Sequence, residues 1–186
     1  CPGMSRMAGA LVSMELARGD GSFNTFFGVH SGLAMGSINA FGSDEQKERW
    51  LPRMARMEMI GAFALTETDA GSDAAAIRTR ATRVDGGWRI TGSKQFITSG
   101  KIAGVAMVFA VTDPDAGKRG ISAFLVPTDA EGYSVDKVEH KLGQSSSDTC
   151  ALRFEDCVVA DDALLGEEGR GYAIALANLE AGRIGI

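Results

Sequence analysis

Residues 61–73 read Gly-Ala-Phe-Ala-Leu-Thr-Glu-Thr-Asp-Ala-Gly-Ser-Asp, a short apolar run followed by a loop of small residues. Such a loop leaves backbone N–H groups open to an anion or to the polar edge of a ring system. Gly71 lets the backbone approach a phosphate closely, and the hydroxyl of Ser72 can donate to an anionic oxygen. The segment predicts a strand and a ligand-binding loop; the alternative is a turn capped by Ser72 and Asp73.

Residues 94–99 read Lys-Gln-Phe-Ile-Thr-Ser. Phe96 and Thr98 are two residues apart, so on a strand they face the same side. A flat, partly polar ring system needs a surface to lie on and hydrogen-bonding groups along its edge, and the two segments together offer both. A Phe on a strand is by itself more often a core residue, so only the pairing of the segments favours a cofactor site.

The first third of the chain has the apolar spacing of helices. The spacing predicts one helix over residues 4–18 and a second, with a wide apolar stripe, over residues 22–41. Ser43 and Gln46 form a capping-box signature that opens a third helix, and Pro52 suits the first turn of a short fourth helix. This part is therefore expected to be all-helical.

After residue 60 the pattern changes to β-rich runs separated by turns. The predicted strands are residues 79–84, 88–91, 95–98, 105–111, 121–126 and 151–154. An antiparallel barrel or sandwich fits these runs best. Helical spacing returns after Gly166 and continues to the last residues. The fold class is therefore expected to be α+β, with helices, then a β domain, then the start of a further helical unit.

Composition excludes several classes of function. The net charge is −5 with the signs interspersed, which offers neither a basic stripe for nucleic acid nor a polybasic segment for a membrane. No stretch approaches the roughly 20 apolar residues of a membrane span. Three cysteines without metal-ligand spacing predict neither a disulfide framework nor a metal site, so Cys150 and Cys157 are interpreted as small apolar fillers. The first residue, Cys1, and the ending at Ile186 suggest a piece of a longer chain.

The order of elements and the two segments resemble the acyl-CoA dehydrogenase family over essentially all 186 residues. The resemblance implies three parts. Residues 1–60 would be a partial N-terminal helical domain, residues 61–162 the flavin-binding middle β domain, and residues 163–186 the start of a truncated C-terminal helical bundle. Cytoplasmic residence, or an organelle matrix in a eukaryote, is the default.

The resemblance implies FAD as the cofactor. It assigns to the FAD site Phe63, Ala64, Leu65, Thr66, Gly71, Ser72, Phe96, Ile97 and Thr98. Thr66 would reach the pyrimidine edge of the flavin, Phe96 would take the place of an aromatic residue stacked on its face, and Thr98 would donate near its N5 atom. Thr68-Asp69 stand where family members often carry Pro-Gly, which adds a negative charge near the proposed phosphate site.

The resemblance also implies contacts to the CoA portion of the substrate, made by Ser72, Glu180 and Arg183. The planar fork of an Arg can clamp a phosphate, although Glu180 and Arg183 could also be an ordinary pair on a helix surface. Three glycines near residue 170 are interpreted as turn and helix-entry residues, not phosphate ligands: Gly166, Gly169 and Gly171. His30 and His140 are interpreted as structural or solvated.

The implied activity is the oxidation of an acyl-CoA thioester to a trans-2-enoyl-CoA. Electrons would pass to an electron-transfer flavoprotein, and the full-length enzyme would be a homo-oligomer, either a dimer or a tetramer. No catalytic residue is assigned in this chain, because the family's base in most members is a Glu expected downstream of Ile186, and the chain alone is expected to be inactive. The alternatives are an acyl-CoA oxidase or related flavin monooxygenase, a non-catalytic acyl-CoA-binding subunit, and a purely structural module.

Overall fold

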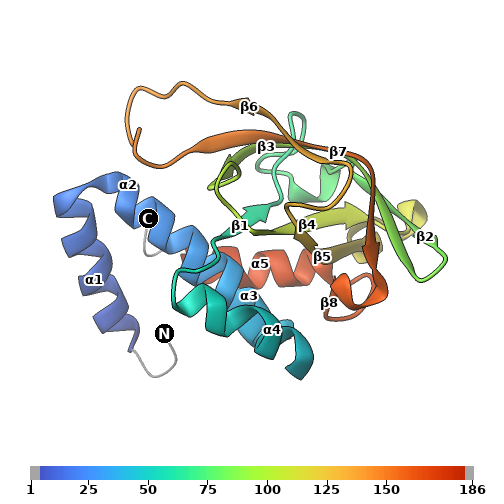
Figure 1. Cartoon of the computed structure of the whole chain (residues 1–186), viewed down its shortest axis with the longest axis horizontal. Helices are drawn as coiled ribbons and strands as arrows, with labels where there is room; N and C mark the ends of the chain where they lie inside the picture. Colours follow the sequence, from blue (N-terminus) through green and yellow to red (C-terminus); the bar gives the residue numbers. More distant parts are fainter. Residues whose placement is uncertain (1–4, 183–186) are drawn as a thin grey trace.

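The computed structural model describes residues 5–182 of the chain. Its helical elements are α1 (Arg6–Gly19), α2 (Gly21–Phe27), the π-helix η1 (Gly28–Met35), α3 (Gly36–Phe41), α4 (Asp44–Ala55), the short 3₁₀ helices η2 (Ala74–Ala76), η3 (Pro114–Gly120) and η4 (Asp161–Ala163), and α5 (Gly171–Gly182). Its strands are β1 (Gly61–Ala64), β2 (Arg80–Val84), β3 (Gly87–Thr98), β4 (Val105–Val111), β5 (Ile121–Pro127), β6 (Tyr133–Val138), β7 (Thr149–Ala160) and β8 (Leu164–Leu165). Figure 1 shows α5 returning beneath the sheet to lie beside η1 and α3. The expected order of helices, sheet and helix is confirmed.

The predicted helix over residues 22–41 is one continuous run, but its middle is a π-helix. Gly28 and Gly36, at the two junctions, both keep right-handed helical angles, so α2, η1 and α3 follow one another without a break. Apolar spacing does not separate a π turn from an α turn, which is why the sequence predicts only a helix here. Such π segments are frequent at functional sites, and η1 contacts β1 at the cavity described below.

Helix α4 begins as predicted and continues further. Ser43 Oγ accepts from the Gln46 backbone N–H at 3.2 Å, and Gln46 Oε1 accepts from the Ser43 N–H at 3.1 Å, which is the predicted capping box. The prediction that Pro52 opens a separate fourth helix is wrong, because Pro52 lies inside α4. Pro52 and Glu48 are both exposed, so the carbonyl that Pro52 cannot bond can be hydrated.

The sheet is mostly antiparallel, with strand order β6-β7-β3-β2-β4-β5-β8, and β1 pairs with β4. The exceptions to antiparallel pairing are β1 with β4 and the single pair Arg80 and Val111. The predicted runs 88–91 and 95–98 are two parts of one strand, β3. Strand β6 has no predicted counterpart; five of its six residues are exposed, and the alternation of Tyr133 and Val135 is broken before Val138. Pairing with β7 holds it in place.

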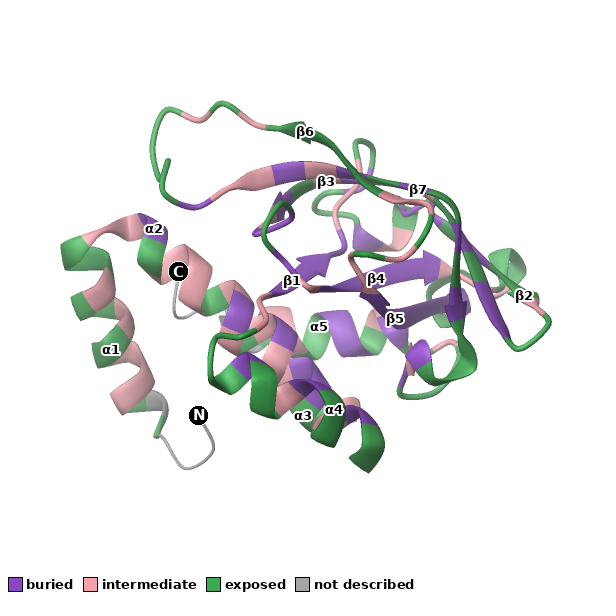
Figure 2. Cartoon of the chain, in the orientation of Figure 1, coloured by how far each residue is buried: buried purple, intermediate pink, exposed green. Residues whose placement is uncertain are grey.

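The core lies on both faces of β4. Val105, Met107 and Phe109 pack in one cluster with buried residues of the helices, such as Met54 and Ile174. The alternate residues of β4 pack in a second cluster between the strands, around Trp88, Phe124 and Phe154. Figure 2 shows β4 and β5 buried along their length, whereas α1 is largely exposed. A strand covered on both faces reads as a continuous apolar run, as residues 105–111 do.

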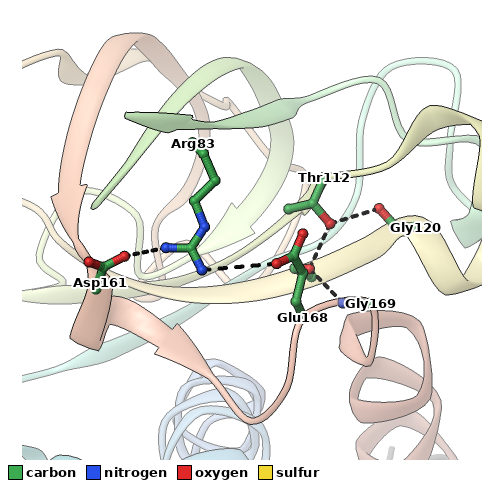
Figure 3. Close-up of polar contacts among 7 residues, drawn as sticks. Arg83, Thr112, Gly120, Asp161, Glu168 and Gly169 are labelled. Atoms are coloured by element: carbon green, nitrogen blue, oxygen red, sulfur yellow. Dashed lines mark hydrogen bonds and ion pairs between the residues drawn. The ribbon is translucent and has the colours of Figure 1, made fainter. Parts of the chain in front are cut away.

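The connection into α5 is fastened to the sheet (Figure 3). The Gly169 N–H donates to Ser122 Oγ at 2.8 Å. Gly169 has φ +78°, and a Cβ there would lie 2.3 Å from the carbonyl oxygen of Arg119; at Gly171 a Cβ would lie 2.5 Å from the Ser122 carbonyl carbon. The interpretation of these two glycines as turn and helix-entry residues is therefore confirmed. Arg83 adds ion pairs to Asp161 and, at 4.0 Å, to Glu168.

Cys150 and Cys157 are buried free thiols in the strand cluster, which confirms their interpretation as small apolar side chains. Burial raises the pKa of Cys157 to about 11, so the thiol stays protonated at neutral pH. Within residues 5–182, no helix combines the length and apolar character needed to cross a bilayer.

Candidate functional site

A cavity of about 340 Å³ lies where η1, β1, the end of β3 and α5 meet. Its lining consists of Val29, Leu33, Phe63, Leu65, Thr66, Gly71, Ser72, Phe96, Ile97, Thr98 and Leu179. Eight of the nine residues predicted for the cofactor site are among them. A larger cavity, of about 660 Å³, lies between α4 and strands β5 and β7 and contains none of the predicted residues.

The exception is Ala64. Side chains alternate along β1, so Phe63 and Leu65 face the helices and the cavity, whereas Ala64 faces the strand cluster and is fully buried there. The side chain of Ala64 does not line the cavity. Phe63 is held by the ring of Phe109, with ring centroids 4.9 Å apart.

The end of β3 is bulged at Phe96. Pairing with β7 shifts register between Lys94 and Ile97, and Phe96 has φ +58°, in the left-handed region that an aromatic residue rarely adopts. The bulge brings Phe96, Ile97 and Thr98 to the cavity together, although Ile97 is buried and its side chain belongs to the strand cluster. Phe96 is 59 % exposed, so its ring is presented at the cavity and not packed in the core. Strained backbone of this kind is found mainly where a site requires it.

The loop after β1 is capped by one of the two residues that the turn alternative names. Asp73 caps η2 by accepting from the Ala75 N–H at 3.2 Å, as the turn alternative expects, and Ser72 remains exposed at the cavity. A Cβ on Gly71 would meet no atom within 4 Å, so the space beside this residue is open. The extra negative charge of Asp69 has a partner, Arg78, at 3.4 Å on the protein surface.

Lys94 and Glu67 form a buried ion pair behind the cavity wall. Lys94 Nζ lies 2.7 Å from Glu67 Oε1, and the two side chains are 0 % and 10 % exposed. Burial lowers the pKa of Lys94 to about 8, and the carboxylate of Glu67 limits that fall. Burial works to raise the pKa of Glu67, but Lys94 and the hydrogen-bond donors outweigh it, so this pKa is lowered. Both residues stand in the two quoted segments, yet the sequence offers no sign that they pair.

Of the two predicted substrate contacts that the structure describes, one lies at the cavity. Ser72 lies at the cavity, whereas Glu180 is exposed on α5 and is absent from the cavity lining; its neighbour Leu179 lines the cavity instead. Arg183 lies outside the described residues. Val29 and Leu33 also line the cavity, and sequence reasoning does not assign either to the site. Leu33 belongs to the predicted apolar stripe, and a stripe on a helix has the same spacing in a core as at a cavity.

His30 has the structural role predicted for it. Its Nδ1 accepts from the Gly61 N–H at 3.1 Å, and its Nε2 lies 3.1 Å from the Met54 carbonyl oxygen, so the neutral ring with a proton on Nε2 satisfies both contacts. Burial lowers the pKa of His30, and the contact with Met54 partly offsets it. His140 is exposed.

The arrangement suits a flat ring with a polar edge. Apolar walls, an exposed aromatic ring and the half-buried Thr66 and Thr98 surround a volume near the lower end of the roughly 300–1,000 Å³ usual for ligand sites. The volume is suited to a ring system more than to a whole dinucleotide. None of the lining residues among those described is ionisable, so this lining can bind and orient a ligand but cannot abstract a proton.

Residues 1–58 match the family model for the acyl-CoA dehydrogenase N-terminal domain, and residues 62–157 match the model for its middle domain. The human mitochondrial short-chain specific acyl-CoA dehydrogenase is 42% identical over 184 residues, which is 99% of this chain and 45% of that protein. The structure of butyryl-CoA dehydrogenase from Megasphaera elsdenii superposes with a TM-score of 0.95 at 38% identity, over 99% of this chain and 48% of that one.

A glutaryl-CoA dehydrogenase from Mycobacterium smegmatis in complex with FADH2 superposes with a TM-score of 0.91 at 40% identity, over 100% of this chain and 46% of that one. The chain therefore spans less than half the length of these relatives.

Proposed function

Because this chain belongs to the acyl-CoA dehydrogenase family, we propose that it is the flavin-binding part of an enzyme that oxidises an acyl-CoA to the trans-2-enoyl-CoA with FAD. The observation that carries the proposal is the cavity, where Thr66, Phe96 and Thr98 meet from two separate segments. Bound FAD would supply the acceptor for the hydride that leaves the β-carbon of the substrate. The residues of this chain bind and orient the ring on which that step depends.

Each wall of the cavity has a distinct task in this proposal. Phe96 offers its exposed ring to the flavin face, and Leu65 excludes water from it. The Thr66 hydroxyl and nearby main-chain groups serve the pyrimidine edge, and the Thr98 hydroxyl serves the region of N5. Ser72, beside the open space at Gly71, is available to the pyrophosphate and to the CoA arm.

The remaining parts of the reaction belong to groups beyond this cavity lining. The base that takes the α-proton would be a Glu downstream of Ile186, as the resemblance to most family members implies; the described lining of the cavity has no ionisable group. We also propose the division into residues 1–60, 61–162 and 163–186, an electron-transfer flavoprotein as electron acceptor, and a homo-oligomeric enzyme. Contact of Glu180 and Arg183 with CoA remains part of the proposal.

An anaerobic absorption spectrum of the full-length protein tests the function. Butyryl-CoA, the substrate in the name of one relative, is added first, followed by longer acyl-CoAs. Bleaching of a flavin band supports the dehydrogenase. A bound flavin that no acyl-CoA reduces favours a non-catalytic subunit. In a separate aerobic assay, rapid oxygen consumption during turnover favours an oxidase. Absence of flavin from protein purified and reconstituted with FAD overturns the proposal.

A further inference from the structure

We propose that the ion pair of Lys94 and Glu67 is a positioning device that holds the two walls of the flavin cavity at a set spacing. One wall is the segment 65–67 with the loop that follows it, and the other is the bulged end of β3. The inference rests on the proposed function, because it assumes that a flavin lies between these walls. Neither residue lines the cavity, so both would act through the residues that do.

The Lys94 side of the pair joins the walls directly. Its Nζ donates to the Leu65 carbonyl oxygen at 3.0 Å and to Glu67 Oε1 at 2.7 Å. The next residue, Gln95, donates its backbone N–H to the Thr66 carbonyl oxygen at 2.9 Å. Leu65, Thr66 and Glu67 in one wall are thus hydrogen-bonded to Lys94 and Gln95 in the other. Phe96 follows immediately, with its strained backbone.

The Glu67 side closes the loop at its base. Glu67 Oε2 accepts from the Arg78 N–H at 2.6 Å, and Oε1 accepts from the Thr79 N–H at 3.0 Å as well as from Lys94. Residues 67 and 78–79, the two ends of the loop that carries Gly71 and Ser72, therefore meet at one carboxylate. The same carboxylate accepts from Lys94 Nζ, so the base of the loop is also bonded to β3.

Stability alone is a poor explanation for this pair. Removing two charges from water is costly, and apolar side chains of similar volume often serve a core equally well. An apolar pair, however, would remove the hydrogen bonds to the Leu65 carbonyl and from the Arg78 and Thr79 N–H groups, and would leave the hydrogen bond from Gln95 to Thr66 to hold the walls with fewer constraints. Directional hydrogen bonds from Lys94 and to Glu67 select one relative position of the walls. The pair is neutral overall, so it sets this geometry without adding net charge behind the flavin.

The test is the double variant Lys94→Met/Glu67→Gln in the full-length protein. It removes both charges, so neither charge is left buried without its partner. The matched control is Arg56→Met/Glu58→Gln, because that pair has the same 2.7 Å separation but is exposed and remote from the cavity lining. Three quantities are measured: the melting temperature without FAD, the dissociation constant for FAD, and the visible circular dichroism of the bound flavin, which reports its surroundings.

We expect the double variant to melt cooperatively while its FAD dissociation constant rises about tenfold or more, a loss of the size known for residues that orient metal ligands from outside the site, and its flavin dichroism changes. The control should match the wild type. A folded double variant that binds FAD within about twofold of the wild type, with the same dichroism, overturns the inference and leaves a merely structural pair.

A second variant, Glu67→Asp, covers the case in which the double variant does not fold. It keeps both charges but shortens the reach of the carboxylate, so the loop base must shift toward Lys94. Weaker FAD binding and altered dichroism support the inference, and unchanged values overturn it. Failure of the wild-type protein itself to bind FAD would instead overturn the proposed function, so the two failures are distinguishable.

Discussion

Phe96 offers a test of both its backbone conformation and the role of its ring. Its φ of +58° lies in the left-handed region, and its side chain is 59 % exposed, so the ring contributes little to the core. We compare Phe96→Gly with Phe96→Ala. Both variants lose the ring, and only the glycine is free of the steric cost of positive φ.

The expected difference follows from two opposing effects. Left-handed backbone costs an L-residue about 1–2 kcal/mol, which the glycine avoids. Glycine in turn loses about 0.4–1 kcal/mol more than alanine through the greater freedom of its unfolded chain. The glycine variant should therefore be more stable than the alanine variant by about 0.5–1 kcal/mol, or about 1–4 °C in melting temperature for a chain of this size. On a regular strand the sign would be reversed, with glycine less stable than alanine by about 0.5–1 kcal/mol.

The assay is thermal unfolding of the two variants without FAD, followed by FAD titration. Both variants should bind FAD more weakly than the wild type, by about 2- to 13-fold if the lost stacking is worth about 0.5–1.5 kcal/mol. An alanine variant that melts above the glycine variant would refute the left-handed backbone at Phe96. Unchanged FAD binding in both would refute the ring as a cofactor platform.

Three further predictions concern the fold and the loop. Protonation of His30 removes the acceptor for the Gly61 N–H. Because burial lowers the pKa of His30 in the folded state and an unfolded His titrates near about 6.5, the free energy of unfolding should fall as the pH drops below about 6.5. Melting temperatures at about pH 7.5 and about pH 5.5 test this, and His30→Gln should show a smaller fall. Gly169→Ala should destabilise the protein by more than about 2 kcal/mol, because its φ is +78° and the new Cβ would lie 2.3 Å from a backbone oxygen; a smaller loss in denaturant unfolding would contradict that clash. Gly71→Ala is the counterpart, since a Cβ there meets no atom within 4 Å: its unfolding free energy should stay within about 0.5 kcal/mol of the wild type while FAD affinity falls, and equal affinity would argue against close approach of a phosphate.

Locally encoded features could be predicted from the sequence, because each depends on residues a few positions apart. The capping box of Ser43 and Gln46 is one, and the apolar run of β4 is another. The two segments that meet at the cavity were also recognisable, because small residues in a loop and an aromatic–hydroxyl pair are visible in the sequence itself. Pro52 shows the limit of such reasoning: proline is typical of the first turn of a helix, but here α4 continues through it.

The sequence by itself therefore determined the order of elements and the α+β class, and its resemblance to the family indicated most of the residues that line the cavity. Alternation along β1 also places Ala64 opposite Phe63 and Leu65. Only the tertiary structure decided that Phe96 takes a left-handed backbone and that Lys94 pairs with Glu67. The reason is physical: periodicity places a residue on one side of its own element, whereas a bulge or a buried charge pair depends on which other element packs against it. Lys94 and Glu67 are 27 residues apart, and only the approach of β3 to the loop after β1 brings them within hydrogen-bonding distance.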